Sequence, residues 1–476
     1  MKKSDIIKLN IEKTDSSGRG IGYIDGKICF VSGTLEGEIV EAEIYTVHKS
    51  YITAGVTKIL SSSPFRQEGY CEVSDSCGGC PLSHIKYEKQ LQIKRQHVVD
   101  TLSRIGGIKN AENIVNNTIG MEKPEKYRNK MVFPIGQKGN HAIGGFYAPR
   151  SHDVVGLNSC CVGEDCATNA LKVVLDFMNE YGVLAYDEKS HRGFIRRVFV
   201  RCGYHSRDLM VVISTYNEKI KNLDNLIDML KSTDFGTYNL KSIILNVNSA
   251  KNNLVLGNKN ITLWGTDSIC DSILGLNFTI SPHSFFQVNP VQTERLYAKA
   301  LELAEIDATK TVLDIYCGIG TISLCAAKQA KKVVGVEIVA AAIEDAKNNA
   351  KANELENTEF YCGAAEDIVP RLIEKGEQPD VVIIDPPRKG SDEKTLSAIL
   401  TAAPDKIVYV SCNPATLARD AKFLTEGGYK MIGATPVDMF PNTEHVETVA
   451  LLTQMKPDEV LCIELNEDDL KGMNKK

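Results

Sequence analysis

"VLDIYCGIGTISLCAAKQAKKVVGVEI", residues 312–338, contains two apolar stretches separated by a glycine turn and an amphipathic segment. Near-continuous apolar strands that alternate with helices are typical of a parallel sheet covered on both faces. The same alternation continues along the chain as far as Cys412. The sequence therefore predicts an α/β fold of the Rossmann-like kind over residues 286–455.

Acidic residues stand where three of these strands are expected to end. Asp314 precedes two glycines, Glu337 ends the second strand, and "GAAEDI" places Glu366 or Asp367 after the third. Ligands of open parallel sheets bind at the carboxyl ends of strands, and an acid ending the second strand can accept both ribose hydroxyls. The turn lacks GxGxxG spacing and an anion cradle. This favours a cationic cofactor without phosphate, S-adenosylmethionine, over another nucleotide.

The next two strands end in residues suited to chemistry on a nucleobase. "IIDPPRKG" places Asp385 at a strand end, followed by Arg388 and Lys389, which could contact a phosphate. "YVSCNPATLARD" places Cys412 at the tip of the following strand. A thiolate can add to C6 of uracil and make C5 nucleophilic toward a methyl group. We therefore predict that Cys412 is a covalent nucleophile; the alternative is a buried structural cysteine.

This chemistry also needs a base that removes the C5 proton. The segment "MFPNTEHVETV" lies about 35 residues after Cys412 and contains Glu444, His445 and Glu447. A general base contributes about 10²–10⁴ in rate. By spacing alone, each of the three is a candidate.

Composition restricts the class of protein. The chain has 476 residues, 43% of them hydrophobic, which is enough for full cores. It has no apolar run of membrane-spanning length and no signal-peptide pattern, so we expect a cytoplasmic protein. The net charge of −6 argues against indiscriminate coating of nucleic acid, but it allows an enzyme with a local basic face.

Four regions follow from the pattern along the chain. Residues 1–60 alternate β-branched and polar residues with glycine punctuation, which is typical of a small β-barrel that binds oligonucleotides or of another small β domain. Residues 61–285 mix cysteines, strands and helices. We expect the helical part of this region, near residues 86–120, to pack on the catalytic domain. Residues 286–455 form that domain, and residues 456–476 form a charged tail.

Fourteen cysteines are more than the cores of a cytoplasmic chain need. "CEVSDSCGGC" contains Cys71, Cys77 and Cys80, and "LNSCCVGEDC" supplies further thiols, including Cys160 and Cys161. Three close cysteines need a fourth to complete a four-thiolate site. Zinc and a [4Fe-4S] cluster both fit these ligands, and free surface thiols are the alternative.

Five segments together resemble one known family, the uracil-C5 methyltransferases of RNA, and in particular those that act on 23S ribosomal RNA. The resemblance covers nearly the whole chain and is carried by "SPHSFFQVN", "DIYCGIGT", "DPPRKG", "YVSCNPATLARD" and "MFPNTEHVE".

That resemblance implies a role for individual residues. Cys412 would be the nucleophile and Glu447 the base. The contacts to S-adenosylmethionine would fall on Gln287, Tyr316, Glu337 and Asp385. The resemblance also favours the [4Fe-4S] cluster over zinc, with the ligands Cys71, Cys77, Cys80 and Cys161 and with Cys160 as the rival fourth ligand.

The first 60 residues resemble a TRAM domain, a small RNA-binding β-barrel, through "GRGIGYIDGKICFVSGTLEGE". The family resemblance implies that related transfer-RNA enzymes lack this domain and the cysteine cluster, so 23S rRNA is the expected substrate, with no obligate protein partner. Tyr127, Phe133 and Phe285 are candidates for stacking a flipped base. Two alternatives remain: the same reaction on tRNA, and an inactive iron–sulfur RNA-binding protein with a methyltransferase fold.

Overall fold

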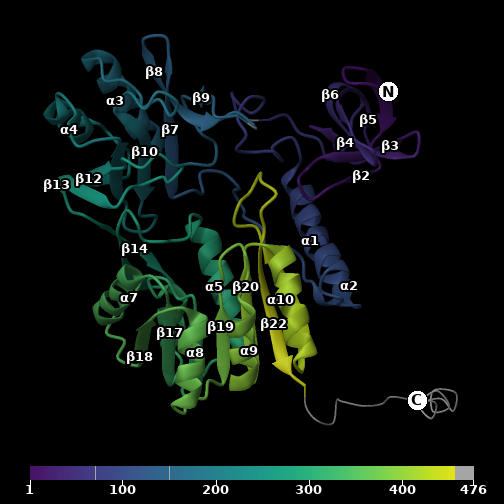
Figure 1. The fold of residues 1–476 in the computed structure, drawn as a ribbon, viewed down its shortest axis with the longest axis vertical. Helices are drawn as coiled ribbons and strands as arrows, with labels where there is room; N and C mark the ends of the chain where they lie inside the picture. The colour runs from purple at the N-terminus through teal and green to yellow at the C-terminus, as the bar shows by residue number, and fades with distance from the viewer. Residues whose placement is uncertain (70, 150, 456–476) are drawn as a thin grey trace.

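The computed structural model describes residues 1–69, 71–149 and 151–455, so the predicted charged tail lies outside the described residues. Apart from a two-stranded hairpin, the described residues form three larger sheets in chain order (Figure 1): an N-terminal sheet in purple, a central sheet in blue and teal, and a C-terminal sheet in green and yellow. Within the described part of the chain, no helix combines the length and apolar character that a bilayer span needs.

The N-terminal sheet has six strands in the order β1-β5-β6-β4-β3-β2. Alternate residues of its strands point into one small core, which includes Cys29, Val31, Val40 and Ala42. This alternation of buried and exposed side chains is what the sequence of residues 1–60 predicts for a β-barrel or similar β domain. The strands are β1 (Ile6–Asn10), β2 (Lys13–Thr14), β3 (Gly20–Ile24), β4 (Lys27–Ser32), β5 (Ile39–Val47) and β6 (Tyr51–Ser61).

Two helices follow the cysteine-rich segment. The long helix α1 (Tyr87–Arg104) and the short α2 (Ala111–Ile114) run alongside the C-terminal sheet (Figure 1). Val98, Val99 and Leu102 of α1 are buried in the same hydrophobic cluster as residues of that sheet. The chain after α2 then bridges to β21 at Ala434 and Val437. The N-terminal third of the chain therefore contributes a helix to the C-terminal domain.

The central sheet has seven strands in the order β13-β12-β11-β10-β7-β8-β9, and α3 and α4 pack on it. A hairpin, β14 and β15, leads from it to the C-terminal domain, and both its strands are buried with residues of the two sheets. The elements are β7 (Lys130–Lys138), β8 (His141–Tyr147), β9 (Val154–Gly156), α3 (Asp165–Tyr181), β10 (Ile195–Cys202), β11 (Asp208–Thr215), α4 (Leu223–Ser232), β12 (Asn239–Val247), β13 (Lys259–Gly265), β14 (Ile269–Ile273) and β15 (Leu276–Ile280).

The C-terminal sheet has seven strands in the order β18-β17-β16-β19-β20-β22-β21. Alternate residues of β16, β17, β19 and β20 enter two separate cores, one with α5, α6 and α7 and one with α1, α8, α9 and α10. The predicted Rossmann-like sheet with two covered faces is confirmed. Its elements are α5 (Pro290–Ala304), β16 (Thr311–Ile315), α6 (Thr321–Ala327), β17 (Lys332–Glu337), α7 (Ala340–Ala352), β18 (Thr358–Cys362), α8 (Ala365–Glu374), β19 (Val381–Ile384), α9 (Glu393–Ala402), β20 (Lys406–Ser411), α10 (Pro414–Glu426), β21 (Tyr429–Val437) and β22 (Glu447–Gln454).

The strand–helix alternation predicted a parallel sheet, but only part of the sheet is parallel. Strands β18, β17, β16, β19 and β20 are parallel, but β22 pairs antiparallel with both β20 and β21. The connection between β21 and β22, residues 438–446, is too short for a parallel pair, since such a pair needs a crossover of a dozen or more residues. This reversal brings the start of β22 to the edge where the parallel strands end.

Candidate active site

One cavity of about 670 Å³ opens at the carboxyl ends of the parallel strands. A volume of this size is typical of sites for small molecules and cofactors. All six residues that the sequence predicts for catalysis and for cofactor contacts line it: Gln287, Tyr316, Glu337, Asp385, Cys412 and Glu447.

The glycine turn after β16 forms one wall of this cavity. The backbone amide of Gly318 donates to Oε2 of Glu337 at 3.2 Å, and the amide of Val339 donates to Oε1 at 2.9 Å. Each carboxylate oxygen keeps a lone pair for a further donor. Glu337 is thus fixed in place with its remaining acceptor capacity directed to the cavity that it lines.

Tyr316 adopts a left-handed backbone conformation with φ of 69°. Such conformations of non-glycine residues are uncommon, and they concentrate at functional sites. Its hydroxyl lies 3.2 Å from Oγ of Ser391, and its backbone amide donates to the carbonyl of Val336. These contacts hold the ring against the cavity. Ile338, which is 65% exposed, adds an apolar surface beside Glu337.

Buried carboxyl groups give the cavity its electrostatic character. Burial raises the pKa of Asp385 to about 7, with a smaller contribution from Asp314. Burial likewise raises the pKa of Asp314 to about 7, against the lowering effect of its hydrogen bond from Ser323. Oδ1 of Asp314 has no hydrogen-bond partner among the described residues. The cavity therefore favours a ligand that is positively charged or that donates hydrogen bonds.

Cys412 and Glu447 come from neighbouring strands. Ser411 of β20 pairs with Thr448 of β22 in the antiparallel ladder, so Cys412 and Glu447 occupy the next position of the two chains. Asn413 caps α10 by accepting from the amide of Ala415 at 3.0 Å, which fixes the turn that follows the thiol. The thiol and the carboxyl group thus face the same cavity.

The thiol of Cys412 and the carboxyl group of Glu447 both have raised pKa values, and the same neighbouring charges affect the two groups. Burial raises the pKa of the Cys412 thiol to about 11, Glu447 adds to the rise, and Arg388 opposes it. Burial also raises the pKa of Glu447 to about 8, Asp385 adds, and Arg388 again opposes it. Arg388 is therefore the cation that favours the charged form of both groups.

Of the other residues predicted from the sequence, only some line the cavity. Glu366, Arg388, Lys389, His445 and the 65% exposed Phe285 line the cavity, whereas Asp367 and Glu444 do not. The prediction that Tyr127 and Phe133 stack on a base is wrong. Both side chains are buried, and the hydroxyl of Tyr127 donates to the carbonyl of Pro441. Phe133 lies on β7, where strand alternation turns it into the core of the central domain, and Tyr127, just before this strand, is buried in the same core.

The basic segment before β7 contributes residues that were not singled out by sequence. Arg128 and Lys130 line the cavity from the central domain, two positions apart and thus on one face of the chain. Burial lowers the pKa of Lys130 to about 8, and Arg201 and Arg128 lower it further. The only signal for them in the sequence is the basic character of "YRNKMVFPIG".

The two cysteine-rich segments lie near each other. The pKa of Cys161 is raised, chiefly by the Cys80 thiol, and Cys71 also interacts with it. Burial raises the pKa of Cys77, and the thiols of Cys160, Cys71 and Cys161 contribute. No group of three or more His, Cys, Asp or Glu side chains in the described ranges is arranged to hold a single metal ion.

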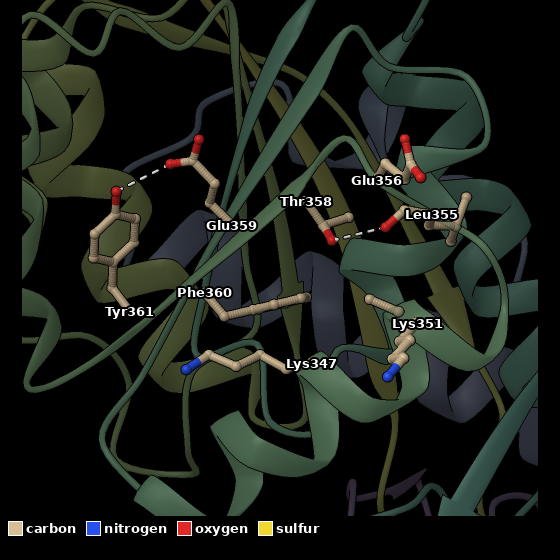
Figure 2. A pocket seen from close by; sticks show the side chains of 9 residues that line it. Lys347, Lys351, Leu355, Glu356, Thr358, Glu359, Phe360 and Tyr361 are labelled. Atoms are coloured by element: carbon tan, nitrogen blue, oxygen red, sulfur yellow. Dashed lines mark hydrogen bonds between the residues drawn. The ribbon is translucent and has the colours of Figure 1, made fainter.

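A second hollow lies at the edge of the sheet, between α7 and β18 (Figure 2). Lys347, Lys351, Glu356 and Glu359 surround it, and Tyr361 donates to Glu359 at 3.0 Å. None of the residues predicted for catalysis or for binding lines this hollow. The six residues predicted for catalysis and for cofactor contacts line the strand-end cavity instead.

Comparison with known proteins agrees with this geometry. Residues 210–455 match the family model described as tRNA (uracil-5-)-methyltransferase, and residues 4–57 match the TRAM domain. An "uncharacterized RNA methyltransferase" of Clostridium tetani is 46% identical over 453 residues, which is 95% of this chain and 97% of that protein. One of Listeria monocytogenes serovar 1/2a is 44% identical over 95% of this chain and 98% of that protein.

A solved structure extends the comparison to the fold. The Pyrococcus abyssi tRNA (uracil-54, C5)-methyltransferase in complex with S-adenosyl-L-homocysteine matches with a TM-score of 0.73 and 28% identity. The match covers 94% of this chain and 100% of the other. The chain therefore belongs to the tRNA (uracil-5-)-methyltransferase family and is an S-adenosylmethionine-dependent RNA uracil-C5 methyltransferase with an N-terminal TRAM domain.

Proposed function

We propose that the protein methylates uridine C5 through a temporary covalent bond between Cys412 and C6 of the ring, with Glu447 as the base. The observation that carries this proposal is the register of β20 and β22. It brings a thiol and a carboxyl group to the same cavity, whose lining also includes Asp314, Glu337 and Asp385.

The residues of the cavity suit S-adenosylmethionine. Glu337 would accept the ribose hydroxyls, Ile338 would pack on the adenine, and Tyr316, Gln287 and Asp385 would surround the rest of the cofactor. Buried carboxyl groups and the unpartnered Oδ1 of Asp314 match a sulfonium cation and its donor groups. When bound, the cofactor supplies an electrophilic methyl group.

The chain's own residues would carry the remaining chemistry. The Cys412 thiolate adds to C6, and the electrons of the C5–C6 double bond move onto the ring as an enolate, which makes C5 a nucleophile. After C5 has gained the methyl group, Glu447 takes the C5 proton. The electrons of the C5–H bond restore the double bond, and the Cys412 thiolate leaves. A carboxyl group with a pKa of about 8 is well matched to accept a proton near neutral pH.

RNA containing 5-fluorouridine tests the nucleophile. Fluorine replaces the proton that the base must remove, so the adduct cannot resolve after methyl transfer. We expect wild type to form an RNA–protein adduct that survives denaturing electrophoresis and Cys412→Ala to form none. An adduct of equal yield in the alanine variant would remove Cys412 from its role.

The expectation of 23S rRNA relied on the premise that related tRNA enzymes lack both the TRAM domain and the cysteine cluster. The Pyrococcus abyssi tRNA enzyme covers 94% of this chain, and the uncovered remainder is shorter than the TRAM match of residues 4–57. The presence of this domain therefore does not distinguish the two substrates.

We keep 23S rRNA as the first candidate because the five catalytic segments resemble the 23S enzymes. Transfer RNA is the second candidate, and the structural similarity to the Pyrococcus abyssi tRNA enzyme favours it. In either case we propose a cytoplasmic enzyme whose first 60 residues help to bind RNA. Mapping 5-methyluridine in the ribosomal and transfer RNA of a deletion strain decides the question, because the modification disappears only from the true substrate.

We further propose that Cys71, Cys77, Cys80 and Cys161 hold a [4Fe-4S] cluster. Each thiolate of such a cluster ligates a different iron, so the sulfurs need not converge on one point. This agrees with thiols that interact across two segments without forming a single-ion site. Cys160 is the rival ligand, although its side chain is buried in the core of the central domain.

Anaerobic reconstitution with iron and sulfide tests the cluster proposal. We expect about four irons per chain in wild type, consistent with a [4Fe-4S] cluster. Cys161→Ser should lower the iron content, whereas Cys160→Ser should not. Retention of full iron by Cys161→Ser would assign the fourth position to another thiol, and wild type that binds no iron would end the proposal.

A further inference from the structure

The loop between β21 and β22, residues 438–446, delivers Glu447 to the cavity and carries Phe440 and His445 into its wall. Five consecutive carbonyls of this loop accept hydrogen bonds from other elements. The acceptor and donor pairs are Asp438 with Gln292, Met439 with Asn289, Phe440 with Lys94, Pro441 with Tyr127, and Asn442 with the amide of Leu82. The backbone path of this loop is therefore set from outside the loop.

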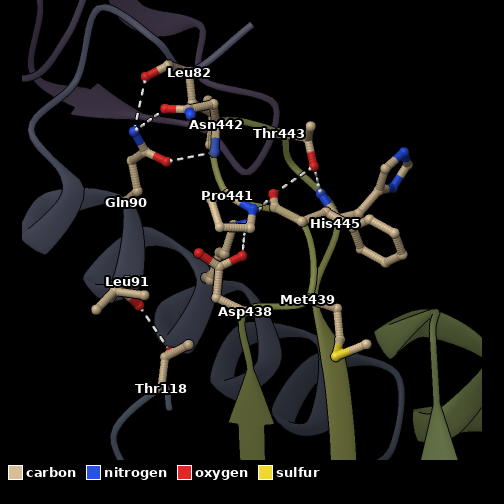
Figure 3. A network of polar contacts seen from close by, with 12 residues as sticks. Leu82, Gln90, Leu91, Thr118, Asp438, Met439, Pro441, Asn442, Thr443 and His445 are labelled. Carbon is tan, nitrogen blue, oxygen red and sulfur yellow. Dashed lines mark hydrogen bonds and ion pairs between the residues drawn. The ribbon is translucent and has the colours of Figure 1, made fainter. Parts of the chain in front are cut away.

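Helix α1 also contacts this loop through side chains that lie far from it in the sequence. Figure 3 shows the Gln90 side chain against Asn442: Nε2 donates to Oδ1 of Asn442 at 3.1 Å, and the amide of Asn442 donates to Oε1 at 2.9 Å. Nε2 also donates to the carbonyl of Leu82 at 3.1 Å. Gln90 thus joins the helix, the chain after the cysteine-rich segment and the loop.

One turn further along α1, Lys94 reaches the same loop. Its Nζ donates to the carbonyl of Phe440 at 3.0 Å and forms an ion pair with Asp438. Both side chains are fully buried, at 1% and 0% exposed. A buried ion pair is no more stabilising than apolar side chains of the same volume. Apolar side chains of the same volume can therefore replace Lys94 and Asp438 without loss of packing. The carbonyl of Phe440 also accepts from the amide and the hydroxyl of Thr443, so the bond from Lys94 ties this turn of the loop to α1.

The geometry of the loop depends on these contacts. Asn442 has a φ of 68°, which is unfavourable for a non-glycine residue, and Gln90 holds both its amide and its side chain. From this turn, the chain continues through Thr443, whose Oγ1 accepts from the amide of His445 at 3.3 Å (Figure 3). Two residues later it reaches Glu447. A shift of the turn at Asn442 would therefore also move the carboxyl group of Glu447, which lies only five residues later.

We propose that Gln90 and Lys94 are positioning residues for Glu447: they lock the β21–β22 loop so that the carboxyl group meets the C5 proton of the covalent intermediate. This inference rests on the proposed role of Glu447 as the base. Helix α1, which precedes the catalytic domain in the sequence, would then take part in the second half of the reaction, the resolution of the covalent adduct.

Two variants test the assignment without relying on a damaged fold. Lys94→Met with Asp438→Leu replaces the buried pair by apolar side chains and removes the bond from α1 to the Phe440 carbonyl, which keeps its donors in Thr443. Gln90→Met keeps the length of the side chain and removes its contacts with Asn442. Leu102→Ala is the matched control, because Leu102 is buried on the same helix two turns beyond Lys94, in the core with the sheet.

Single-turnover reactions with unmodified RNA separate formation of the adduct from its resolution. We expect both loop variants to form the adduct at the wild-type rate and to resolve it about 10–100-fold more slowly, since a misplaced catalytic group costs about this much. The KM values for RNA and cofactor should stay unchanged. Leu102→Ala should lower the thermal midpoint but leave resolution unchanged.

Three outcomes would overturn the inference: wild-type resolution in both loop variants, equal slowing in Leu102→Ala, or a raised KM for RNA with normal resolution. Failure of the proposed function looks different, because wild type itself would then form no adduct with 5-fluorouridine RNA.

Discussion

Ser411 of β20 pairs with Thr448 of β22 at the end of their antiparallel ladder, and Cys412 directly follows Ser411 as Glu447 directly precedes Thr448. A thiol and a carboxyl group that lie 35 positions apart in the sequence thus share one cavity. Backbone hydrogen bonds of the C-terminal sheet hold β20 and β22 at this register.

Glu447→Gln should stall the reaction after methyl transfer. The amide keeps the shape of the side chain but cannot accept the C5 proton, so the covalent intermediate should accumulate and turnover should fall about 10²–10⁴-fold. Denaturing electrophoresis of the variant with ordinary RNA and cofactor measures the trapped species. Turnover at the wild-type rate would show that another group is the base.

Resolution of the adduct should become faster as pH rises. Glu447 acts in its ionised form, and burial followed by Asp385 raises its pKa to about 8 in the cofactor-free protein. Single-turnover resolution should therefore increase with pH up to a plateau. Arg388→Met should move this profile to higher pH, because Arg388 lowers the pKa of Glu447. A profile that does not respond to Arg388→Met would contradict the electrostatic coupling.

The stability of the cofactor-free protein should fall over the same pH range. The folded protein keeps a proton on Glu447 up to about pH 8, whereas the unfolded chain releases it near the usual value of 4.5. The folded state thus binds more protons between these values, and the free energy of unfolding decreases as pH rises through them. Thermal midpoints between pH 5 and pH 9 measure this slope, and it should be smaller in Glu447→Gln. An equal slope in wild type and variant would refute the assignment to Glu447.

Glu337→Gln should weaken binding of the cofactor. The change removes the charge that we propose accepts two ribose hydroxyls, and hydrogen bonds to charged groups contribute about 1.5–3 kcal/mol, or roughly 10–150-fold in affinity. Titration calorimetry with S-adenosylhomocysteine measures the loss. Glu356→Gln, in the hollow at the sheet edge, is the control and should bind as wild type does. Equal affinity of the two variants would place the ribose elsewhere.

Arg66→Met should loosen the N-terminal barrel while the catalytic sheet stays folded. Glu38 has a fully buried side chain and accepts from Nε and Nη2 of Arg66 at 2.5 and 2.8 Å. Loss of the partner leaves a buried charge and should cost about 3 kcal/mol, the low end for such pairs because Arg66 is 19% exposed.

Hydrogen exchange of β4 and β5 in the full chain measures this loosening. Lys89→Met is the control, because Lys89 pairs with the half-exposed Glu36 and should change stability by less than about 1 kcal/mol. Similar protection of the barrel in both variants would mean that the Glu38–Arg66 pair does not stabilise it.

The sequence by itself determined the Rossmann-like sheet and the kind of chemistry at its edge. Apolar runs separated by helices can bury themselves in few other ways, and strand ends at one edge collect whatever polar residues follow them. Tyr316, Glu337, Asp385 and Cys412 each follow a strand or end it, so their place in one cavity was predictable.

Only the tertiary structure decided that Glu447 and His445, but not Glu444, line the cavity with the thiol. The place of Glu447 depends on the reversal of β22 and its register with β20. The tertiary structure also decided that Tyr127 and Phe133 are buried in a core. In the same way, it brought Gln90 and Lys94 of helix α1 into hydrogen bonds with the loop before Glu447. Spacing along a chain specifies faces of helices and strands, but contacts between elements depend on how the faces pack.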